Sequence, residues 1–95
     1  MKFLVMTKMT GSPNMSKEFI ESFRKTLEDK LESGEWDCLY QRVAAGGGVG
    51  IVNADSNDHL WEIVATFPQS NVYEWHVEPL AEIDFVFDKI LEWVG

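Results

Sequence analysis

Strand-like and helix-like spacings of apolar residues alternate along this 95-residue chain in the order strand, helix, strand, strand, helix, strand. This order is typical of the double split-βαβ motif, which forms a four-stranded antiparallel sheet with both helices on one face. We therefore predict an α+β, ferredoxin-like βαββαβ fold that occupies residues 1–95 as a single domain. The strands are expected at residues 2–8, 36–43, 49–54 and 72–78.

The two helices of the motif have recognisable start and stop signals. Asn14 or Ser16 can cap the first helix, whose apolar residues recur at three- and four-residue intervals until Gly34 ends it. The second helix is expected to begin in the acidic segment 55–58 and to end at Pro68.

A C-terminal helix is predicted over residues 82–94, after Pro79 breaks the last strand. It is apolar around more than one face, because Phe85 and Trp93 lie off its main stripe. The motif also leaves one face of the sheet bare. Burying both surfaces against a second copy is the simplest arrangement, so we predict a homodimer that can assemble further.

Charge and cysteine content narrow the classes of partner and compartment. The chain has 16 acidic and 8 basic side chains, a formal charge of -8, with no basic patch. We therefore expect no nucleic-acid partner and no binding to an anionic membrane. Cys38 is the only cysteine, and the N-terminal apolar stretch is too short for a signal peptide, which together favour the cytoplasm.

Framework residues between Gly34 and Leu80 resemble the muconolactone isomerase family. The pattern combines Gly-x-Trp-x-x-Leu-aromatic, Ser-x-x-x-Leu, a helix-ending Pro and a strand that closes on Val-x-x-Leu. These positions are Gly34, Trp36, Leu39, Tyr40, Ser56, Leu60, Pro68, Val77 and Leu80. The resemblance implies a dimeric α+β barrel from the metabolism of aromatic compounds.

The resemblance also implies an activity: cofactor-free isomerisation, by proton transfer, of an unsaturated lactone or aromatic-derived acid. A cofactor-independent monooxygenase or a polyketide cyclase on the same scaffold is a close variant. The competing class is a non-catalytic dimer that binds a small molecule. The family often has Arg directly after the aromatic residue of strand two, where this chain has Gln41, and that difference favours the competing class.

Strand four supplies the first group of candidate residues. Proton transfer next to a carbonyl needs an acid or base and a donor that stabilises the intermediate anion. Alternation along a strand places Glu74, His76 and Glu78 on one face, and Tyr73, Trp75 and Val77 on the other. His76 and Glu74 are therefore candidate catalytic groups. The alternative is that they form the solvated side of an edge strand.

Strand two supplies the second group. Strict alternation places Trp36, Cys38, Tyr40 and Arg42 on one face, where Tyr40 and Arg42 are candidate catalytic groups. Trp36, with Trp75 of strand four, is a candidate wall for a flat aromatic or lactone ligand. The alternative is that the aromatic residues pack in the core or in a dimer interface.

His59 is a further candidate for ligand binding, because the first turn of a helix disfavours its protonation. Two histidines far apart in sequence do not indicate a metal site, and we predict neither a metal nor a cofactor. The run Gly46-Gly47-Gly48 lies between two strands and lacks a P-loop lysine, so it is interpreted as a turn between Ala44-Ala45 and strand three.

Overall fold

The computed structural model describes residues 1–44 and 46–95; Ala45, in the predicted turn, lies outside the described residues. Eight elements follow one another within the described residues. They are β1 (Lys2–Met9), α1 (Lys17–Glu32), β2 (Trp36–Gln41), β3 (Gly48–Asn53), α2 (Asn57–Thr66), the short helix η1 (Ser70–Val72), β4 (Tyr73–Leu80) and α3 (Ile83–Val94).

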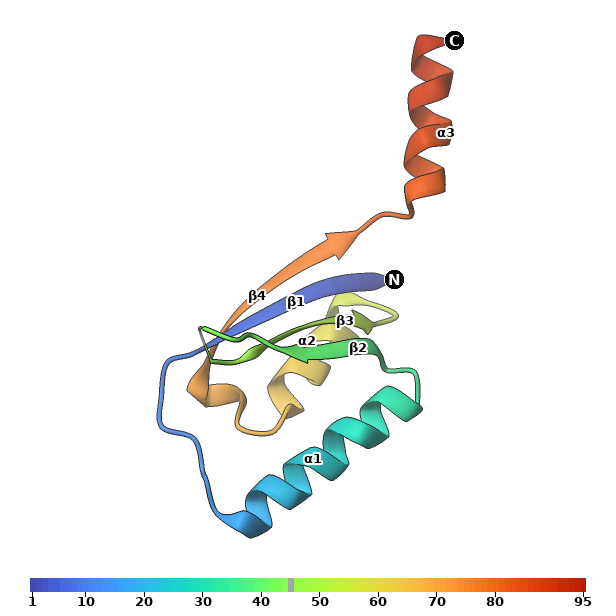
Figure 1. The fold of residues 1–95 in the computed structure, drawn as a ribbon. Coiled ribbons are helices and arrows are strands. Elements are labelled where there is room, and N and C mark those ends of the chain that lie inside the picture. Colours follow the sequence, from blue (N-terminus) through green and yellow to red (C-terminus); the bar gives the residue numbers. More distant parts are fainter. Residues whose placement is uncertain (45) are drawn as a thin grey trace.

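The four strands form one antiparallel sheet in the order β2-β3-β1-β4. Helices α1 and α2 lie on the same side of this sheet, whereas α3 projects away from it (Figure 1). The predicted ferredoxin-like topology is confirmed. We call the sheet surface opposite α1 and α2 the open face.

Local hydrogen bonds explain where the first two helices begin. The Ser16 hydroxyl accepts a hydrogen bond from the Phe19 N–H, and the Ser56 hydroxyl accepts one from the His59 N–H. Each hydroxyl satisfies an amide that has no partner within its helix. Gly34 follows the end of α1 with a φ of 84°, which a residue with a Cβ rarely adopts.

The prediction that Pro79 breaks the last strand is wrong. Pro79 lies within β4 and is paired with Phe3 of β1. β4 is an edge strand, the position in a sheet where proline is tolerated because one side of the strand has no hydrogen-bond partner.

A β-bulge in β2 also changes the predicted faces of that strand. Trp36 pairs with Val52, but Cys38 pairs with Ile51, so Asp37 is the extra residue. An extra residue reverses the alternation that follows it. Trp36 therefore faces the helices while Cys38 lies on the open face, and the prediction that they share a face is wrong.

The bulge is held by side chains from three strands. Asp37 accepts hydrogen bonds from Lys2 and from the Asn53 amide, which also donates to the Gly34 carbonyl at 2.9 Å. The hydrogen bond from Lys2 holds the pKa of Asp37 below its usual value, with a further contribution from Asn53.

The hydrophobic core lies between the sheet and α2. Its buried members are Phe3, Val5, Trp36, Val52, Ala54 and Ile63. α1 contributes no buried residue and lies over β2, with Phe23 and Leu27 partly covered. The space beneath α1 is consequently not filled by the core.

The chain is more extended than a compact monomer of its size. Its radius of gyration is 16.0 Å, against about 12 Å for a typical 95-residue domain. Its accessible surface is 6827 Å², against roughly 5,600 Å² for a folded monomer of this mass. Much of the excess is α3, whose large apolar side chains are exposed. They are Ile83, Phe85, Phe87, Ile90, Leu91, Trp93 and Val94.

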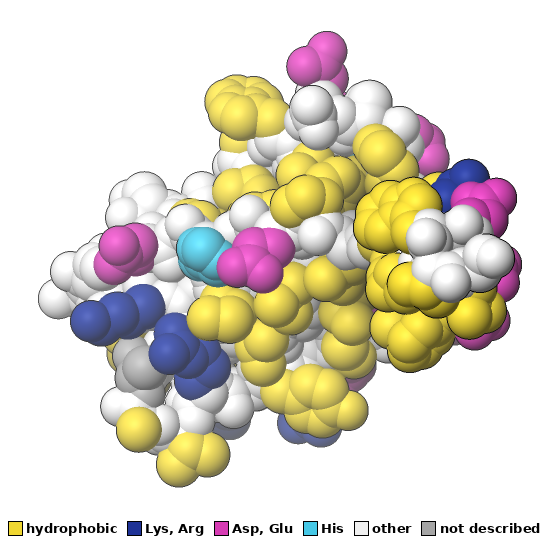
Figure 2. Space-filling view, turned by 90° about the horizontal axis from the view of Figure 1, so that it is seen from above, with side chains coloured by type: hydrophobic (Ala, Val, Ile, Leu, Met, Phe, Trp, Pro, Cys, Tyr) yellow, Lys and Arg dark blue, Asp and Glu magenta, His cyan; other side chains and the backbone are white. Residues whose placement is uncertain are grey.

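The open face and α3 together form an extensive apolar surface. Viewed from above, hydrophobic side chains cross the sheet in a broad band, and more of them cover the projecting helix (Figure 2). None of the helices within the described residues has the length and apolarity needed to cross a membrane.

Candidate ligand-binding site

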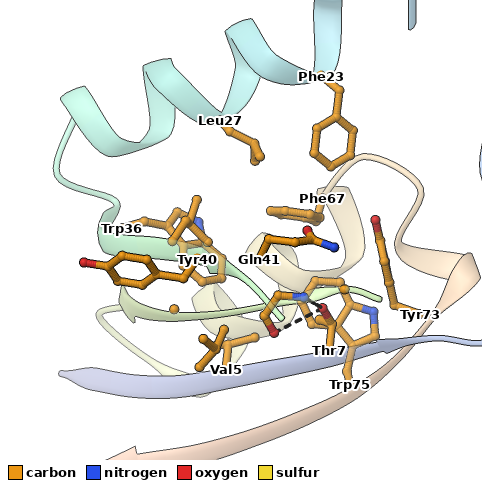
Figure 3. A pocket seen from close by; sticks show the side chains of 15 residues that line it. Val5, Thr7, Phe23, Leu27, Trp36, Tyr40, Gln41, Phe67, Tyr73 and Trp75 are labelled. Carbon is orange, nitrogen blue, oxygen red and sulfur yellow. Dashed lines mark hydrogen bonds between the residues drawn. The ribbon is translucent and has the colours of Figure 1, made fainter. Parts of the chain in front are cut away.

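A cavity of about 230 Å³ lies between the sheet and α1 (Figure 3). Phe23 and Leu27 of α1 form one wall, and Phe67, directly after α2, forms another. The sheet forms the floor. The remaining lining residues are Val5, Thr7, Trp36, Leu39, Tyr40, Gln41, Gly47, Gly48, Val49, Gly50, Tyr73 and Trp75.

Two glycines of β3 form the floor of this cavity. Gly48 and Gly50 belong to the helix-facing side of β3, in the same alternation as the buried Val52. At Gly50 a Cβ would lie 2.5 Å from the Cys38 carbonyl oxygen, so no larger residue fits without a shift of β2. The cavity exists partly because these two positions carry no side chain.

Thr7 and Arg42 join the strands at one end of the floor. The Gly48 N–H donates to the Thr7 hydroxyl at 2.7 Å, shown dashed in Figure 3. Arg42 Nη1 donates to the Thr7 carbonyl at 3.1 Å. Arg42 therefore links β1 to the segment after β2 and is not among the lining residues.

Aromatic rings surround the cavity in edge-to-face or tilted contact. Phe67 is central: its ring centroid lies 5.9 Å from that of Phe23, 5.9 Å from Trp36 and 5.4 Å from Trp75. Tyr73 packs against Trp75 at 6.2 Å in a T-shaped arrangement. Such contacts fix the ring planes and provide flat apolar walls.

The polar groups of the cavity are few. Trp75 Nε1 donates to the Ser70 carbonyl at 2.9 Å, and the buried Trp36 Nε1 has no hydrogen-bond partner among the described residues. Gln41 and Tyr73 rise from the sheet on the side of α1 (Figure 3). Burial raises the pKa of the Tyr73 hydroxyl, so it stays protonated beyond its usual range.

The predicted alternation in β4 is confirmed. Trp75 and Val77 pair with Thr7 and Val5 on the helix side, whereas His76 pairs with Met6 on the open face. His76 Nε2 lies 2.7 Å from Glu78 Oε1, and both side chains are exposed. The candidates His76 and Glu74 therefore lie on the opposite side of the sheet from the cavity.

Tyr40 and His76 lie at opposite edges of the same row across the sheet. Tyr40 pairs with Val49, Val49 with Met6, and Met6 with His76. Three strand spacings separate them by about 14 Å. Within one copy of the chain, the candidate catalytic set of His76, Glu74, Tyr40 and Arg42 is not brought together.

His59 lies at the start of α2, where its Nδ1 accepts a hydrogen bond from the Asp55 N–H at 3.0 Å. This contact completes the helix start, and His59 does not line the cavity. Within the described residues, no three His, Cys, Asp or Glu side chains lie close enough together to hold a metal ion.

Of the sequence candidates, Trp36, Trp75 and Tyr40 border the cavity, the last with a side chain that is 69% exposed. Gln41 and Tyr73 are not among the residues predicted from the sequence, and the glycine run is predicted only as a turn. A signal was available: Gly48-Val49-Gly50 places two glycines on one side of a strand, which is typical of a close approach.

Comparison with known proteins agrees with this architecture. A family model described as muconolactone delta-isomerase matches residues 1–84. The chain belongs to the muconolactone delta-isomerase family. A solved structure described as muconolactone isomerase at 3.3 Å resolution is similar, with a TM-score of 0.68 and 16% sequence identity. That match covers 86% of this chain and 90% of the other. No curated protein matches the chain.

At 16% identity the structural likeness shows the fold. This member of the muconolactone delta-isomerase family therefore shares the four-stranded sheet and its two covering helices with the solved isomerase. The family match ends at residue 84, so most of α3 lies beyond it.

Proposed function

We propose that this chain binds a flat unsaturated ring, such as a lactone or an aromatic-derived compound, in its cavity and isomerises it by proton transfer without a cofactor. The observation that carries the proposal is the aromatic-walled cavity in a muconolactone delta-isomerase fold. Its volume of about 230 Å³ exceeds the roughly 150 Å³ of an apolar cavity known to hold one benzene ring.

The polar groups of the cavity suit one part of such a reaction. Removing a proton next to a carbonyl places negative charge on the carbonyl oxygen, and hydrogen-bond donors stabilise that charge. Tyr73 offers a hydroxyl and Gln41 an amide from the sheet side of the cavity. We assign these two residues the role of donors to the carbonyl oxygen. The cavity is open on one side, so water there would accept the proton from one carbon and return a proton to another.

A second candidate function, ligand binding without turnover, is favoured by a specific observation. No carboxylate or imidazole is present among the described lining residues, so none of them is an ordinary general base. His76 and Glu74 of the edge strand β4 remain proposed acid–base groups for a substrate on the open face. Tyr40 and Arg42 lie at the opposite edge of the sheet, on or directly after β2.

Hydrogen–deuterium exchange separates the two functions. The protein is incubated in D₂O with muconolactone and with simpler butenolides, and proton NMR follows both isomerisation and exchange beside the carbonyl. Proton transfer predicts protein-dependent exchange even where no net isomerisation occurs. Saturable ligand binding with no exchange would instead establish the binding function, and Tyr73→Phe tests the donor by slowing exchange.

We also propose that the chain works as a homodimer. Two observations support a second copy as the partner: the excess accessible surface of about 1,200 Å² over a typical monomer, and the projecting apolar helix α3. A stable interface buries about 800 Å² on each partner, which this excess can supply. Light scattering of the purified protein measures the assembly directly.

A further inference from the structure

We infer that the cavity selects uncharged planar rings over the same rings bearing a carboxylate. This inference rests on the proposed function only in taking the cavity as the ligand site, and it holds whether or not the ligand is turned over. Its basis is the lining: the 15 lining residues that the structure describes include no Lys, Arg, His, Asp or Glu.

The cation nearest in sequence to the lining residue Gln41 is committed elsewhere. Arg42 follows Gln41 directly, but its guanidinium donates to the Thr7 carbonyl and helps to hold the strands together. Moving it into the cavity would break that hydrogen bond. The net charge of -8 adds a long-range repulsion for anions that approach the protein.

The free-energy cost of desolvation is larger for a ring that bears a carboxylate than for a neutral ring. The cavity is open on one side, so a carboxylate that binds against its apolar walls loses part of its hydration, and only an opposite charge or several hydrogen bonds compensate for that loss. A lactone, ester or amide carbonyl needs a single donor, which the Tyr73 hydroxyl or the Gln41 amide can provide. The cavity therefore favours the neutral form of a given ring.

The aromatic walls of the cavity account for the preference for a planar ligand. Phe67 meets Trp36 and Trp75 with its ring tilted or perpendicular to theirs, so both ring faces and ring edges border the cavity. Leu27 lines the space from α1, and the glycine floor lies opposite. A single flat ring fits such a space better than a branched or bulky ligand.

Matched ligand pairs test the selection by calorimetry. The probes are benzamide against benzoate, and the methyl ester of muconolactone against muconolactone itself, at neutral pH. We expect the neutral member of each pair to bind at least about tenfold more tightly. Gln41→Lys, which adds a cation beside the floor at an exposed position, should reverse the preference.

The inference would be overturned by a carboxylate that binds as tightly as its neutral partner, or by the absence of saturable binding of either neutral probe. A cavity-blocking variant, Leu27→Trp, should abolish binding of the neutral probes, and unchanged binding would place the ligand elsewhere and also overturn the inference. Circular dichroism checks that each variant folds.

The exchange experiment keeps this inference distinct from the proposed function. Tight binding of neutral rings without proton exchange would support the inference and remove the isomerase function. Exchange on muconolactone, together with a preference for its carboxylate form, would support the isomerase function and overturn the inference.

Discussion

The backbone of Gly50 lies directly against the indole of Trp36: a Cβ at Gly50 would be 3.0 Å from Trp36 Cε3 and 2.5 Å from the Cys38 carbonyl oxygen. Gly50→Ala should therefore push β2 away from β3 and reduce the free energy of unfolding by about 1–3 kcal/mol. Urea denaturation measures the change.

Gly11→Ala is the matched control for that substitution. Its Cβ would lie 3.4 Å from Val72, an ordinary van der Waals contact, and Gly11 does not have a positive φ. We expect a change within about 0.5 kcal/mol of wild type. Equal destabilisation by both substitutions would contradict the close approach at the floor.

The same region shows how far sequence reasoning reaches. The order of strands and helices follows from apolar spacing and from Ser16, Ser56 and Gly34, and the structure confirms it. The bulge at Asp37 does not follow from spacing, because it depends on Lys2 and Asn53, which meet Asp37 only once three strands have paired. One inserted residue then reverses the faces of the rest of β2.

Alkaline pH should destabilise the protein partly through Tyr73. Burial raises its pKa above the ordinary value of 10.0, so above that pH the unfolded chain loses the phenolic proton while the folded chain retains it. The folded state then binds more protons, and stability falls as pH rises. In Tyr73→Phe this contribution is absent, and denaturation at about pH 8 and about pH 10.5 should show a smaller loss.

Tyr40→Phe is the matched control, because it removes the other tyrosine at a position where the side chain is 69% exposed. We expect its loss of stability between the two pH values to follow that of wild type more closely than Tyr73→Phe does. An equal reduction of the loss in both variants would rule out burial of Tyr73 as the cause.

The cavity was only partly predictable for a related reason. Trp36 and Trp75 are identifiable as aromatic walls from composition and alternation, and both line it. From the sequence, Gln41 is notable only because it departs from the family pattern. In the structure it is the last residue of β2, and its side chain lies on the side of α1. The position of α1 above β2, which creates the space, depends on packing that sequence periodicity does not determine.

The apolar face of α3 should hold the homodimer together. The double substitution Phe87→Ser with Leu91→Ser removes two large exposed side chains from that helix without a change in net charge. If these side chains are buried against a second copy, we expect the dimer dissociation constant to rise at least about 100-fold. Light scattering over a dilution series measures it.

The control for α3 is Lys89→Ser with Glu92→Ser on the polar side of the helix. It also preserves net charge and introduces the same residues. It removes an exposed ion pair at 3.2 Å and the contact of the Lys89 ammonium with the Phe85 ring, 5.7 Å from its centroid. The dimer should persist. Dissociation by both double substitutions would indicate loss of the helix rather than loss of an apolar interface, and dissociation by neither would remove α3 from the interface.

His76 should be dispensable for binding in the cavity, because its side chain lies on the open face and contacts Glu78. Replacing it with Gln retains a polar side chain of similar size but removes the imidazole. We expect His76→Gln to bind the methyl ester of muconolactone within about twofold of wild type. Phe67→Ala, which removes the ring between Trp36 and Trp75, should weaken that binding at least about tenfold.

Proton exchange in these two variants shows whether the chemistry takes place in the cavity or on the open face. If exchange takes place in the cavity, His76→Gln retains it and Tyr73→Phe slows it, because only Tyr73 lines that space. Loss of exchange in His76→Gln with binding intact would move the chemistry to the open face, where His76 Nε2 lies 2.7 Å from Glu78 Oε1. Since Tyr40 lies about 14 Å from His76 in one copy, such a site would need the Tyr40 of a second copy to complete it.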